Sequence, residues 1–212
     1  TGYIIIGNPD LKVAYIKNYD ARWEWYLSRD ESVSVGLFYK EFDAPIEAVI
    51  LPGTNNERSF INAQSATTQG IELDVYHWLG FANENLENYF VSANLTLIDS
   101  SVSIKLKDSG TLTSLTRPLQ GQADYIANIQ FGYDDGEKQK SSLVYHVTGA
   151  KIREVGVLGA PDVMDEAYGE LDFAYTRFWG DHLEFNLKAK NLLDKLEKTT
   201  QGGFDVNRLH EG

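Results

Sequence analysis

Polar and apolar residues alternate along much of this chain, and the pattern is clearest in residues 18–40. The first half of this stretch sets an apolar or aromatic series against a polar one: Tyr19, Ala21, Trp23, Trp25 and Leu27 against Asp20, Arg22, Glu24 and Tyr26. Polar residues 28–32 separate it from a second alternating run, 33–40. Successive side chains of a strand point to opposite faces, so this period predicts two strands, and the short polar break predicts a hairpin.

Further stretches repeat the alternation and bring the number of predicted strands to about eight. They are residues 70–77, 91–97, 125–133, 142–148, 170–176 and 183–188. We expect an all-β fold, a continuous antiparallel, up-and-down meander with one apolar face: Trp23, Leu37, Leu73, Leu95, Ile129, Tyr145, Phe173 and Phe185. We expect the other face to be polar: Glu24, Glu72, Asn94, Asn128, His146, Asp172 and Asn186.

The connections between the predicted strands alternate in length. Those after the first, third, fifth and seventh strands are short, whereas residues 43–66, 99–119 and 151–165 form long connections. We expect these connections, and the tail from 193 to 212, to be irregular loops. A transmembrane β-barrel has short turns at one end and long loops at the other, and a soluble meander has no reason to keep that parity. The lengths therefore favour a barrel in a membrane.

Aromatic residues gather near the strand ends on the short-turn side. They are Trp25, Tyr26, Trp78, Tyr89, Tyr133, Phe178 and Trp179. Amphipathic rings prefer the boundary between lipid and water, so this set predicts a membrane-interface girdle. The alternative for the exposed Trp residues is a platform on which sugars stack.

Composition narrows the range of partners. The chain has 212 residues, a formal net charge of -12 and no cysteine. The acidic balance argues against nucleic acid as a partner, and the lack of cysteine removes thiolate metal sites. No run approaches the 18 or so apolar residues of a transmembrane helix.

The candidate chemical sites have structural explanations. The histidines show no metal-ligand spacing and lie on different predicted elements: His77, His146, His182 and His210. Glu170 and Asp172 alternate on one strand, which is typical of a polar wall rather than a catalytic carboxylate pair. No nucleophile or nucleotide-binding motif occurs. We therefore expect no catalytic residue, no metal, no cofactor and no enzyme activity.

Short motifs spread over nearly the whole chain carry a resemblance to a known family. They are Gly7-Asn8-Pro9-Asp10-Leu11, Asn18-Tyr19-Asp20, Leu37-Phe38-Tyr39-Lys40, Gly70-Ile71-Glu72-Leu73, Pro118-Leu119-Gln120-Gly121-Gln122, residues 125–134, and Asn191-Leu192-Leu193-Asp194-Lys195. In this order they resemble the C-terminal part of the barrel of TonB-dependent outer-membrane receptors. Lys12-Val13-Ala14 departs from the family, which usually has Pro-Glu shortly after the first motif.

The resemblance implies a 22-stranded transmembrane barrel filled by an N-terminal plug. On this view residues 1–212 supply about eight strands, and the plug, the N-terminal strands and the last strand are absent. The implied location is the outer membrane of a Gram-negative bacterium, with its lipid bilayer as one partner. The implied activity is TonB-energised uptake of a scarce ligand: a ferric siderophore, haem, cobalamin or an oligosaccharide. Contact with TonB would occur only through the absent plug.

If the chain is such a receptor, the long loops are the expected site of ligand recognition. Candidate contacts are Asn55, Asn56, Arg58 and Phe60 in residues 43–66, and Arg153 in residues 151–165. Arg offers a planar fork to carboxylate or catecholate oxygens, and Phe and Asn suit an apolar body with a polar rim. The alternative is a soluble all-β carbohydrate-binding module, which would not need detergent for extraction.

Overall fold

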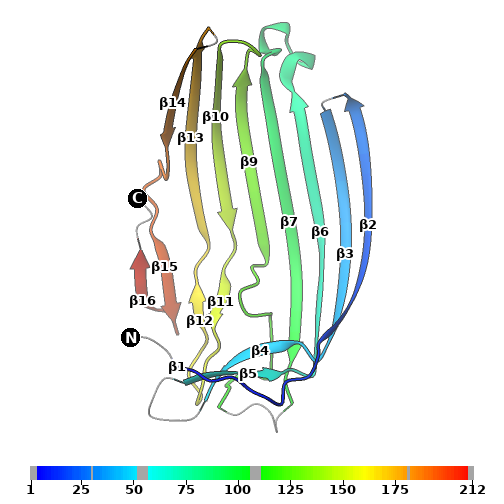
Figure 1. Cartoon of the computed structure of the whole chain (residues 1–212), viewed down its shortest axis with the longest axis vertical. Helices are drawn as coiled ribbons and strands as arrows, with labels where there is room; N and C mark the ends of the chain where they lie inside the picture. Colours follow the sequence, from blue (N-terminus) through cyan, green and yellow to red (C-terminus); the bar gives the residue numbers. More distant parts are fainter. Residues whose placement is uncertain (1–3, 30, 52–56, 106–110, 181, 210–212) are drawn as a thin grey trace.

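The computed structural model describes residues 4–29, 31–51, 57–105, 111–180 and 182–209. Within these residues, eight long strands form one antiparallel sheet, and hydrogen-bonded neighbours follow the order of the chain (Figure 1). The strands are β2 (Tyr15–Ser28), β3 (Glu31–Asp43), β6 (Ser65–Trp78), β7 (Tyr89–Ser103), β9 (Tyr125–Asp134), β10 (Gln139–Thr148), β13 (Tyr168–Trp179) and β14 (Leu183–Ala189). The predicted meander is confirmed. A short strand, β8 (Thr116–Arg117), adds to the end of β7.

The register of the sheet fixes which side chains share a face. Leu73 lies opposite Val35 and Leu95, whereas its neighbour Glu72 lies opposite Gly36 and Thr96. The same alternation runs through all neighbouring pairs from β2 to β14. Both predicted residue sets are therefore confirmed, and we term the two sides the apolar face and the polar face.

The ends of the sheet differ as the connection lengths predict. Short connections follow β2, β6, β9 and β13 at the upper end in Figure 1, and long ones follow β3, β7 and β10 at the lower end. The connection after β6 contains the 3-10 turns η1 (Leu79–Phe81) and η2 (Glu84–Leu86). In the connection after β9, the Asp135 carboxylate accepts hydrogen bonds from the backbone N–H groups of Glu137, Lys138 and Gln139 at 3.1, 2.7 and 2.9 Å. These bonds hold the pKa of Asp135 below its usual value.

The expectation that the long connections and the tail are irregular is wrong. A three-stranded sheet of β1 (Ile4–Ile5), β5 (Glu57–Asn62) and β4 (Ile46–Ile50), which we term the cap, crosses the lower end of the main sheet (Figure 1). A second small sheet continues the main sheet downward: β11 (Lys151–Glu154), β12 (Val163–Asp165), β15 (Glu197–Gln201) and β16 (Phe204–Leu209). These strands are short, and two of the pairings, β1 with β5 and β12 with β15, join distant parts of the sequence, so local alternation gives little sign of them.

The buried apolar core of the described residues lies at the lower end, where the cap meets the sheet. Phe42, Ala66 and Val102 are successive cross-strand partners on the polar face, and Val102 is fully buried. They pack with residues of the cap and the neighbouring connections: Val49, Ala63, Ile104, Leu112, Ile152 and Val155. The polar face thus becomes apolar where the cap covers it, because burial there stabilises apolar side chains.

Two glycines on the polar face lie beneath aromatic rings. A Cβ atom added to Gly70 would collide with the ring of its cross-strand partner Phe38, and one added to Gly132 would collide with the ring of Phe90. The rings therefore occupy the space that side chains would take at these two positions.

Candidate ligand-binding site

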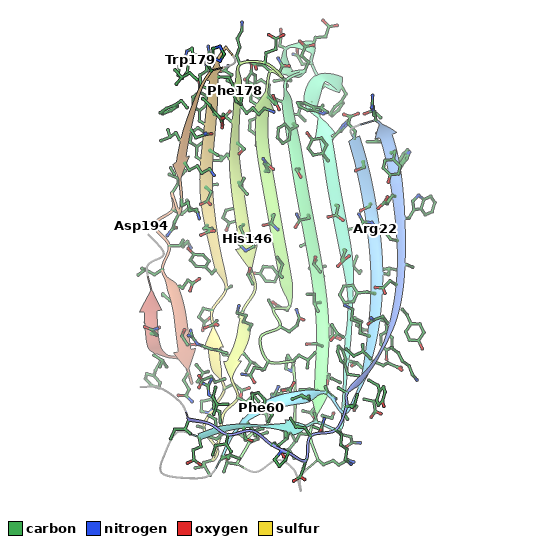
Figure 2. All side chains as sticks on the ribbon, viewed as in Figure 1. Arg22, Phe60, His146, Phe178, Trp179 and Asp194 are labelled. Carbon is green, nitrogen blue, oxygen red and sulfur yellow. The ribbon has the colours of Figure 1, made fainter. Side chains whose placement is uncertain are left out.

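A row of polar side chains crosses the polar face from β2 to β13. Each is the registered cross-strand partner of the next: Glu24, Ser34, Asp74, Asn94, Asn128, His146 and Glu170. Figure 2 places His146 and Arg22, which lies beside this row, at similar heights on the sheet. Arg22 bonds to Glu24 through Nε at 2.6 Å and to Asp74 through Nη1 at 3.2 Å. The row therefore forms a bonded polar wall, in which Arg22 pairs with one carboxylate on its own strand and with one on β6, two strands away.

Hydrogen bonds fix the ring of His146 in this row. Asn128 donates from Nδ2 to the Asn94 carbonyl oxygen at 2.7 Å, which leaves its own carbonyl oxygen facing His146 Nδ1. A neutral His146 assigned from this network carries its proton on Nδ1 and accepts from the Thr148 hydroxyl at Nε2, at 3.1 Å. The Thr148 oxygen then keeps its lone pairs for a further donor.

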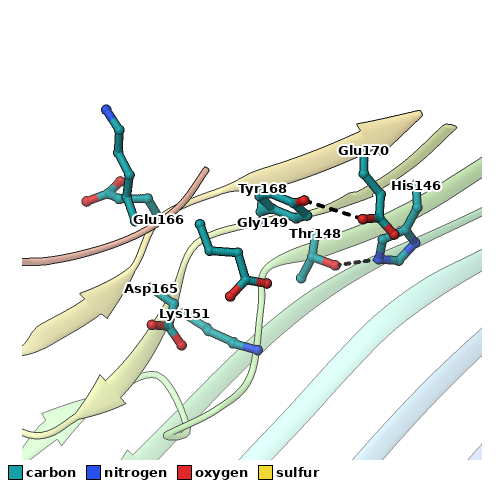
Figure 3. Close-up of a pocket in the computed structure, with 10 residues that line it drawn as sticks. His146, Thr148, Gly149, Lys151, Asp165, Glu166, Tyr168 and Glu170 are labelled. Atoms are coloured by element: carbon teal, nitrogen blue, oxygen red, sulfur yellow. Dashed lines mark hydrogen bonds between the residues drawn. The ribbon is translucent and has the colours of Figure 1, made fainter. Parts of the chain in front are cut away.

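Beside His146, the wall opens into a hollow of about 230 Å³ (Figure 3). Thr148, Tyr168 and Glu170 line it from the main sheet, and the Tyr168 hydroxyl donates to Glu170 Oε2 at 3.3 Å. The second small sheet lines it with Lys151, Asp165, Glu197 and Lys198, and Glu166 directly after β12 completes the lining. The hollow is therefore rich in charge and lies on the polar face, where that face meets the lower end.

Lys151 and Asp165 also line a second hollow of about 390 Å³ beside the cap strand β4. They are cross-strand partners on β11 and β12, yet within the described part of the chain Lys151 forms no ion pair. The Asp165 carboxylate instead binds Arg153 Nη1 at 3.2 Å and accepts from the Thr199 hydroxyl at 3.0 Å. Lys151 therefore stands between two hollows with its ammonium group available.

The predicted ligand-binding residues do not converge on one site. Asn55 and Asn56 lie outside the described residues. Arg58 and Phe60 are half-buried on β5, and Arg58 Nη2 forms an ion pair with Glu154 Oε1 on β11. Arg153 is bound to Asp165 and also donates to the Thr199 hydroxyl at 3.1 Å. Both arginines tie structural elements together, so a ligand would have to compete with their carboxylate partners.

A buried ion pair and the hydrogen bonds of Asn62 hold the cap in place. Arg117 Nη2 bonds to Glu47 Oε2 on β4 at 2.7 Å, and the two side chains are only 3% and 8% exposed. Arg117 Nε has no hydrogen-bond partner among the described residues. The Asn62 amide donates to the carbonyls of Lys12 and Ala44 at 3.0 and 2.8 Å and accepts from the Lys12 N–H at 2.7 Å. The cap is therefore a positioned part of the fold rather than a free loop tip.

The aromatic residues of the predicted girdle divide between the two faces. Trp25, Tyr89, Tyr133 and Trp179 share the register positions of the apolar face. Three others have polar-face positions: Tyr26, whose hydroxyl bonds to Glu24; Trp78, which contacts Tyr76 and Phe90; and Phe178, opposite Glu184. Figure 2 shows Phe178 and Trp179 together at the upper end, although their register positions belong to opposite faces. A girdle role therefore fits the first four residues and does not fit the other three.

The described residues limit two other kinds of site. Within the described ranges, no three His, Cys, Asp or Glu side chains come together in a way that could hold a metal ion. No helix in the described part of the chain is long and apolar enough to cross a membrane.

Comparison with known proteins identifies the family. Residues 1–192 match the family described as TonB dependent receptor-like, beta-barrel. The chain belongs to this family. Its TonB-dependent receptor-like barrel sequence has no match among curated proteins.

Solved structures show the same barrel fold. The siderophore receptor PirA from Acinetobacter baumannii aligns with a TM-score of 0.60 and 18% identity, over 91% of this chain and 29% of that one. The FrpB iron transporter from Neisseria meningitidis aligns at 0.63 and 13%, over 97% and 30%. The copper transporter OprC aligns at 0.65 and 15%, over 91% and 27%. The chain therefore spans less than a third of the length of these proteins.

Sequence reasoning missed the residues that define the hollow. Lys151 and Asp165 mark the ends of what was expected to be an irregular loop, whereas the structure pairs them across two strands. The available signal was apolar Ile152 between charged Lys151 and Arg153, and an alternation this short does not predict a strand. The sequence places His146 on the correct face. The residues across the hollow from it belong to long connections, and local alternation does not predict the strands in those connections.

Proposed function

We propose that this chain forms part of the wall and external loops of a ligand-gated receptor in the outer membrane of a Gram-negative bacterium. The receptor takes up a scarce nutrient with energy delivered through TonB, which acts on a plug outside residues 1–212. These residues supply about eight of the 22 barrel strands. No nucleic acid, cofactor or catalytic step is part of this proposal.

One observation carries the proposal: the large side chains on the apolar face of the sheet are exposed. We propose that this face is the outer one. Trp23 is 77% exposed, Ile129 52% and Leu187 48%. A soluble monomer rarely exposes a contiguous apolar patch of this extent, because burial of such surface is strongly favourable. Lipid would cover this face, and the polar face would line the barrel interior. Trp25, Tyr89, Tyr133 and Trp179 would then lie at the membrane boundary.

The transported ligand is proposed as a class. The solved relatives are named as siderophore, iron and copper proteins. We place a ferric siderophore first and keep haem, cobalamin and an oligosaccharide as the other members of the class. The cap and the second small sheet would face outside the cell, since the long connections of such barrels are external. Arg58, Phe60 and Arg153 stay candidate contacts, together with Asn55 and Asn56.

The test uses a complete receptor that contains this chain. Replacing residues 47–61 with a short turn should abolish binding and energised uptake of a ferric siderophore while the protein still inserts into membranes. Shortening the turn between β2 and β3 should impair assembly instead. Siderophore affinity that stays within a factor of about two after the cap is removed, which is less than roughly 0.5 kcal/mol, would place recognition elsewhere.

Extraction gives a second test against a soluble carbohydrate-binding module. The proposed receptor should stay in the membrane fraction until detergent is added. A complete protein that appears in the soluble fraction and binds oligosaccharides would overturn the proposal.

A further inference from the structure

We propose that the apolar face binds one phospholipid headgroup at its upper end, in a site for a phosphate joined to a primary ammonium group, as in phosphatidylethanolamine. The site lies on a single row across the strands: Asp135, Gln139, Arg177 and Phe185. This inference rests on the proposed function, because it needs the apolar face to lie in a bilayer. It adds a lipid as a specific partner, separate from the transported nutrient.

Arg177 is a charged residue at an apolar-face position. Among the described apolar-face positions of the eight long strands, only Lys17 and Arg177 are lysine or arginine. Lys17 lies opposite the acidic Glu41, whereas Arg177 lies opposite the neutral residues Gln139 and Phe185. A cation on a lipid-facing surface is tolerated near the membrane boundary, where it can reach an anionic group.

The guanidinium of Arg177 keeps most of its donors for such a group. Nη1 donates to Gln139 Oε1 at 3.0 Å, and no carboxylate among the described residues lies at ion-pair distance from Arg177. Gln139 Oε1 also accepts from the Tyr175 hydroxyl at 3.3 Å, so these two donors orient the amide and leave its Nε2 without a partner in the described part of the chain. A phosphate could bind the guanidinium through two parallel hydrogen bonds and accept a third from Gln139 Nε2.

An acid lies at the other end of the row. Asp135 uses Oδ1 for the three backbone N–H groups of its turn, and Oδ2 has no hydrogen-bond partner among the described residues. The backbone N–H of Gln139 is the main cause of the lowered pKa of Asp135, and the charge of Arg177 adds to it. The two charges therefore lie near each other on either side of Gln139. A headgroup with a phosphate alone would be repelled by Asp135, whereas one with a phosphate and an ammonium matches both charges.

The level of the row suits a headgroup. Trp179, the next apolar-face residue on β13, lies at the upper end of the sheet (Figure 2), and Tyr133 lies in the neighbouring row toward the middle of the sheet. Both belong to the residues that fit a membrane-interface girdle. Leu187 lies in the same row as Tyr133 and is exposed. The acyl chains would pack on this part of the apolar face while the headgroup bonds to Arg177.

The test is fluorescence quenching in vesicles of digalactosyldiacylglycerol, a bilayer lipid with neither phosphate nor ammonium. A complete receptor with Trp179 as its single tryptophan is reconstituted with one brominated guest lipid. Phosphatidylethanolamine carries both groups, and phosphatidylglycerol carries only the phosphate. Because bromine quenches a neighbouring indole, the loss of Trp179 fluorescence against guest fraction gives the affinity of the site for the guest relative to the host lipid.

We expect phosphatidylethanolamine to bind about fivefold more tightly than the host, the fold-change typical of one basic residue at a lipid surface. It should also bind more tightly than phosphatidylglycerol. An affinity equal to that of the host, or no higher than that of phosphatidylglycerol, would overturn the inference. A receptor with Trp23 as its single tryptophan reports on the same face at β2 and should show no preference. The same preference at Trp23 would show a general lipid effect and overturn the site.

Variants locate the binding. Arg177→Gln should bring the affinity for phosphatidylethanolamine close to that of the host, whereas Arg177→Lys keeps the charge and should retain part of it, which guards against a folding defect. Lys140→Gln, beside Gln139 in sequence but on the polar face, is the matched control and should bind like the parent. Asp135→Asn keeps an oxygen for the N–H groups of the turn and should bind the two guests alike. Unchanged affinity for phosphatidylethanolamine in Arg177→Gln would overturn the inference.

Failure of this inference is distinguishable from failure of the transport proposal. Energised siderophore uptake by a receptor without the lipid preference overturns the headgroup site and leaves the transport proposal standing. An Arg177-dependent preference in a membrane protein without energised uptake supports the headgroup site and overturns the transport proposal.

Discussion

The eight-stranded main sheet, which we term the wall from here on, and the cap are stabilised in opposite ways. The eight-stranded wall exposes its largest apolar side chains, such as Trp23 and Leu187, on the outer face and bonds polar side chains to one another on the inner face. At the cap, the same inner face becomes apolar and buries Val102 completely. The cap therefore follows the rule of a water-soluble protein, in which apolar burial stabilises the fold. Under the proposed function, the outer side of the wall faces lipid instead of water.

This contrast predicts that the two regions respond to different perturbations. The tryptophans of the chain, Trp23, Trp25, Trp78 and Trp179, lie on β2, β6 and β13 and belong to the wall. In a receptor whose other tryptophans are replaced by phenylalanine, their fluorescence therefore reports on the wall, and limited proteolysis within residues 44–64 reports on the cap. Both can be followed in a complete receptor reconstituted in lipid vesicles.

The largest effect is expected from Arg117→Ala. It leaves the buried Glu47 carboxylate without its partner, which typically costs about 3–5 kcal/mol. Urea should then expose the cap to protease at lower concentration, while the tryptophan transition of the wall stays in place. Adding Glu47→Gln should restore part of the loss, because the orphaned charge is removed. Arg153→Ala, which breaks a more exposed pair, is the control. Simultaneous loss of both signals would contradict the separation of wall and cap.

The next largest effect is expected on the outer face. Leu73→Arg should lower the free energy of unfolding in lipid by about 2–4 kcal/mol, because the charge would enter hydrocarbon. Glu72→Arg changes the neighbouring residue on the polar face and is the matched control. Urea unfolding monitored by tryptophan fluorescence measures both. Equal destabilisation by the two variants would contradict the assignment of the outer face to lipid.

A smaller effect is expected from overpacking the inner face. Gly132→Ala places a methyl group where the Phe90 ring lies, and overpacking of this kind typically costs about 1–3 kcal/mol. Gly36→Ala is the control, because its added Cβ would meet only Glu72, at 3.4 Å. The wall transition should shift in the first variant more than in the second. A larger shift for Gly36→Ala would show that the ring is free to move.

The smallest effect is expected at the turn after β9. The pKa of Asp135 is lowered in the folded state, so its ionised form contributes stability above the unfolded pKa of about 3.9. That contribution disappears as the pH falls through the lower folded value. The difference in thermal midpoint between the parent and Asp135→Asn should be present at neutral pH and vanish in acid. Glu137→Gln removes the same charge from the same turn and is the control for the change in net charge.

The sequence predicts the wall far better than the cap. The faces of the wall follow from adjacent residues, whereas the cap depends on contacts between residues far apart in the sequence. Leu73 and Glu72 are adjacent residues, so their opposite faces follow from the period of a strand. Glu47 and Arg117 are 70 residues apart, and nothing near either one indicates the pair. Phe42, Ala66 and Val102 did carry a usable signal, since each is apolar at a polar-face position where the cap covers it. The parity of Tyr26 with Glu24 likewise placed this aromatic on the inner face.

The site was predictable only in part for the same reason. His146 could be placed on the polar face from its own strand, and the structure confirms it. Lys151 and Asp165 meet only because two short strands pair beyond the end of that strand. Ile152 and Val155, which lie on or beside β11, belong to a buried core whose members come from distant segments, and local alternation does not encode that core.

The rings above Gly70 and Gly132 affect how much room the polar face leaves. A phenylalanine that stood upright on this face would narrow the passage in front of it. Here Phe38 and Phe90 fold down over neighbouring strands, into space that the two glycines leave empty. If the polar face lines a passage as proposed, its clearance at these two levels is set by the spacing of the strands and not by the size of the rings. A bulky cargo could then slide past aromatic surfaces without having to push a side chain aside.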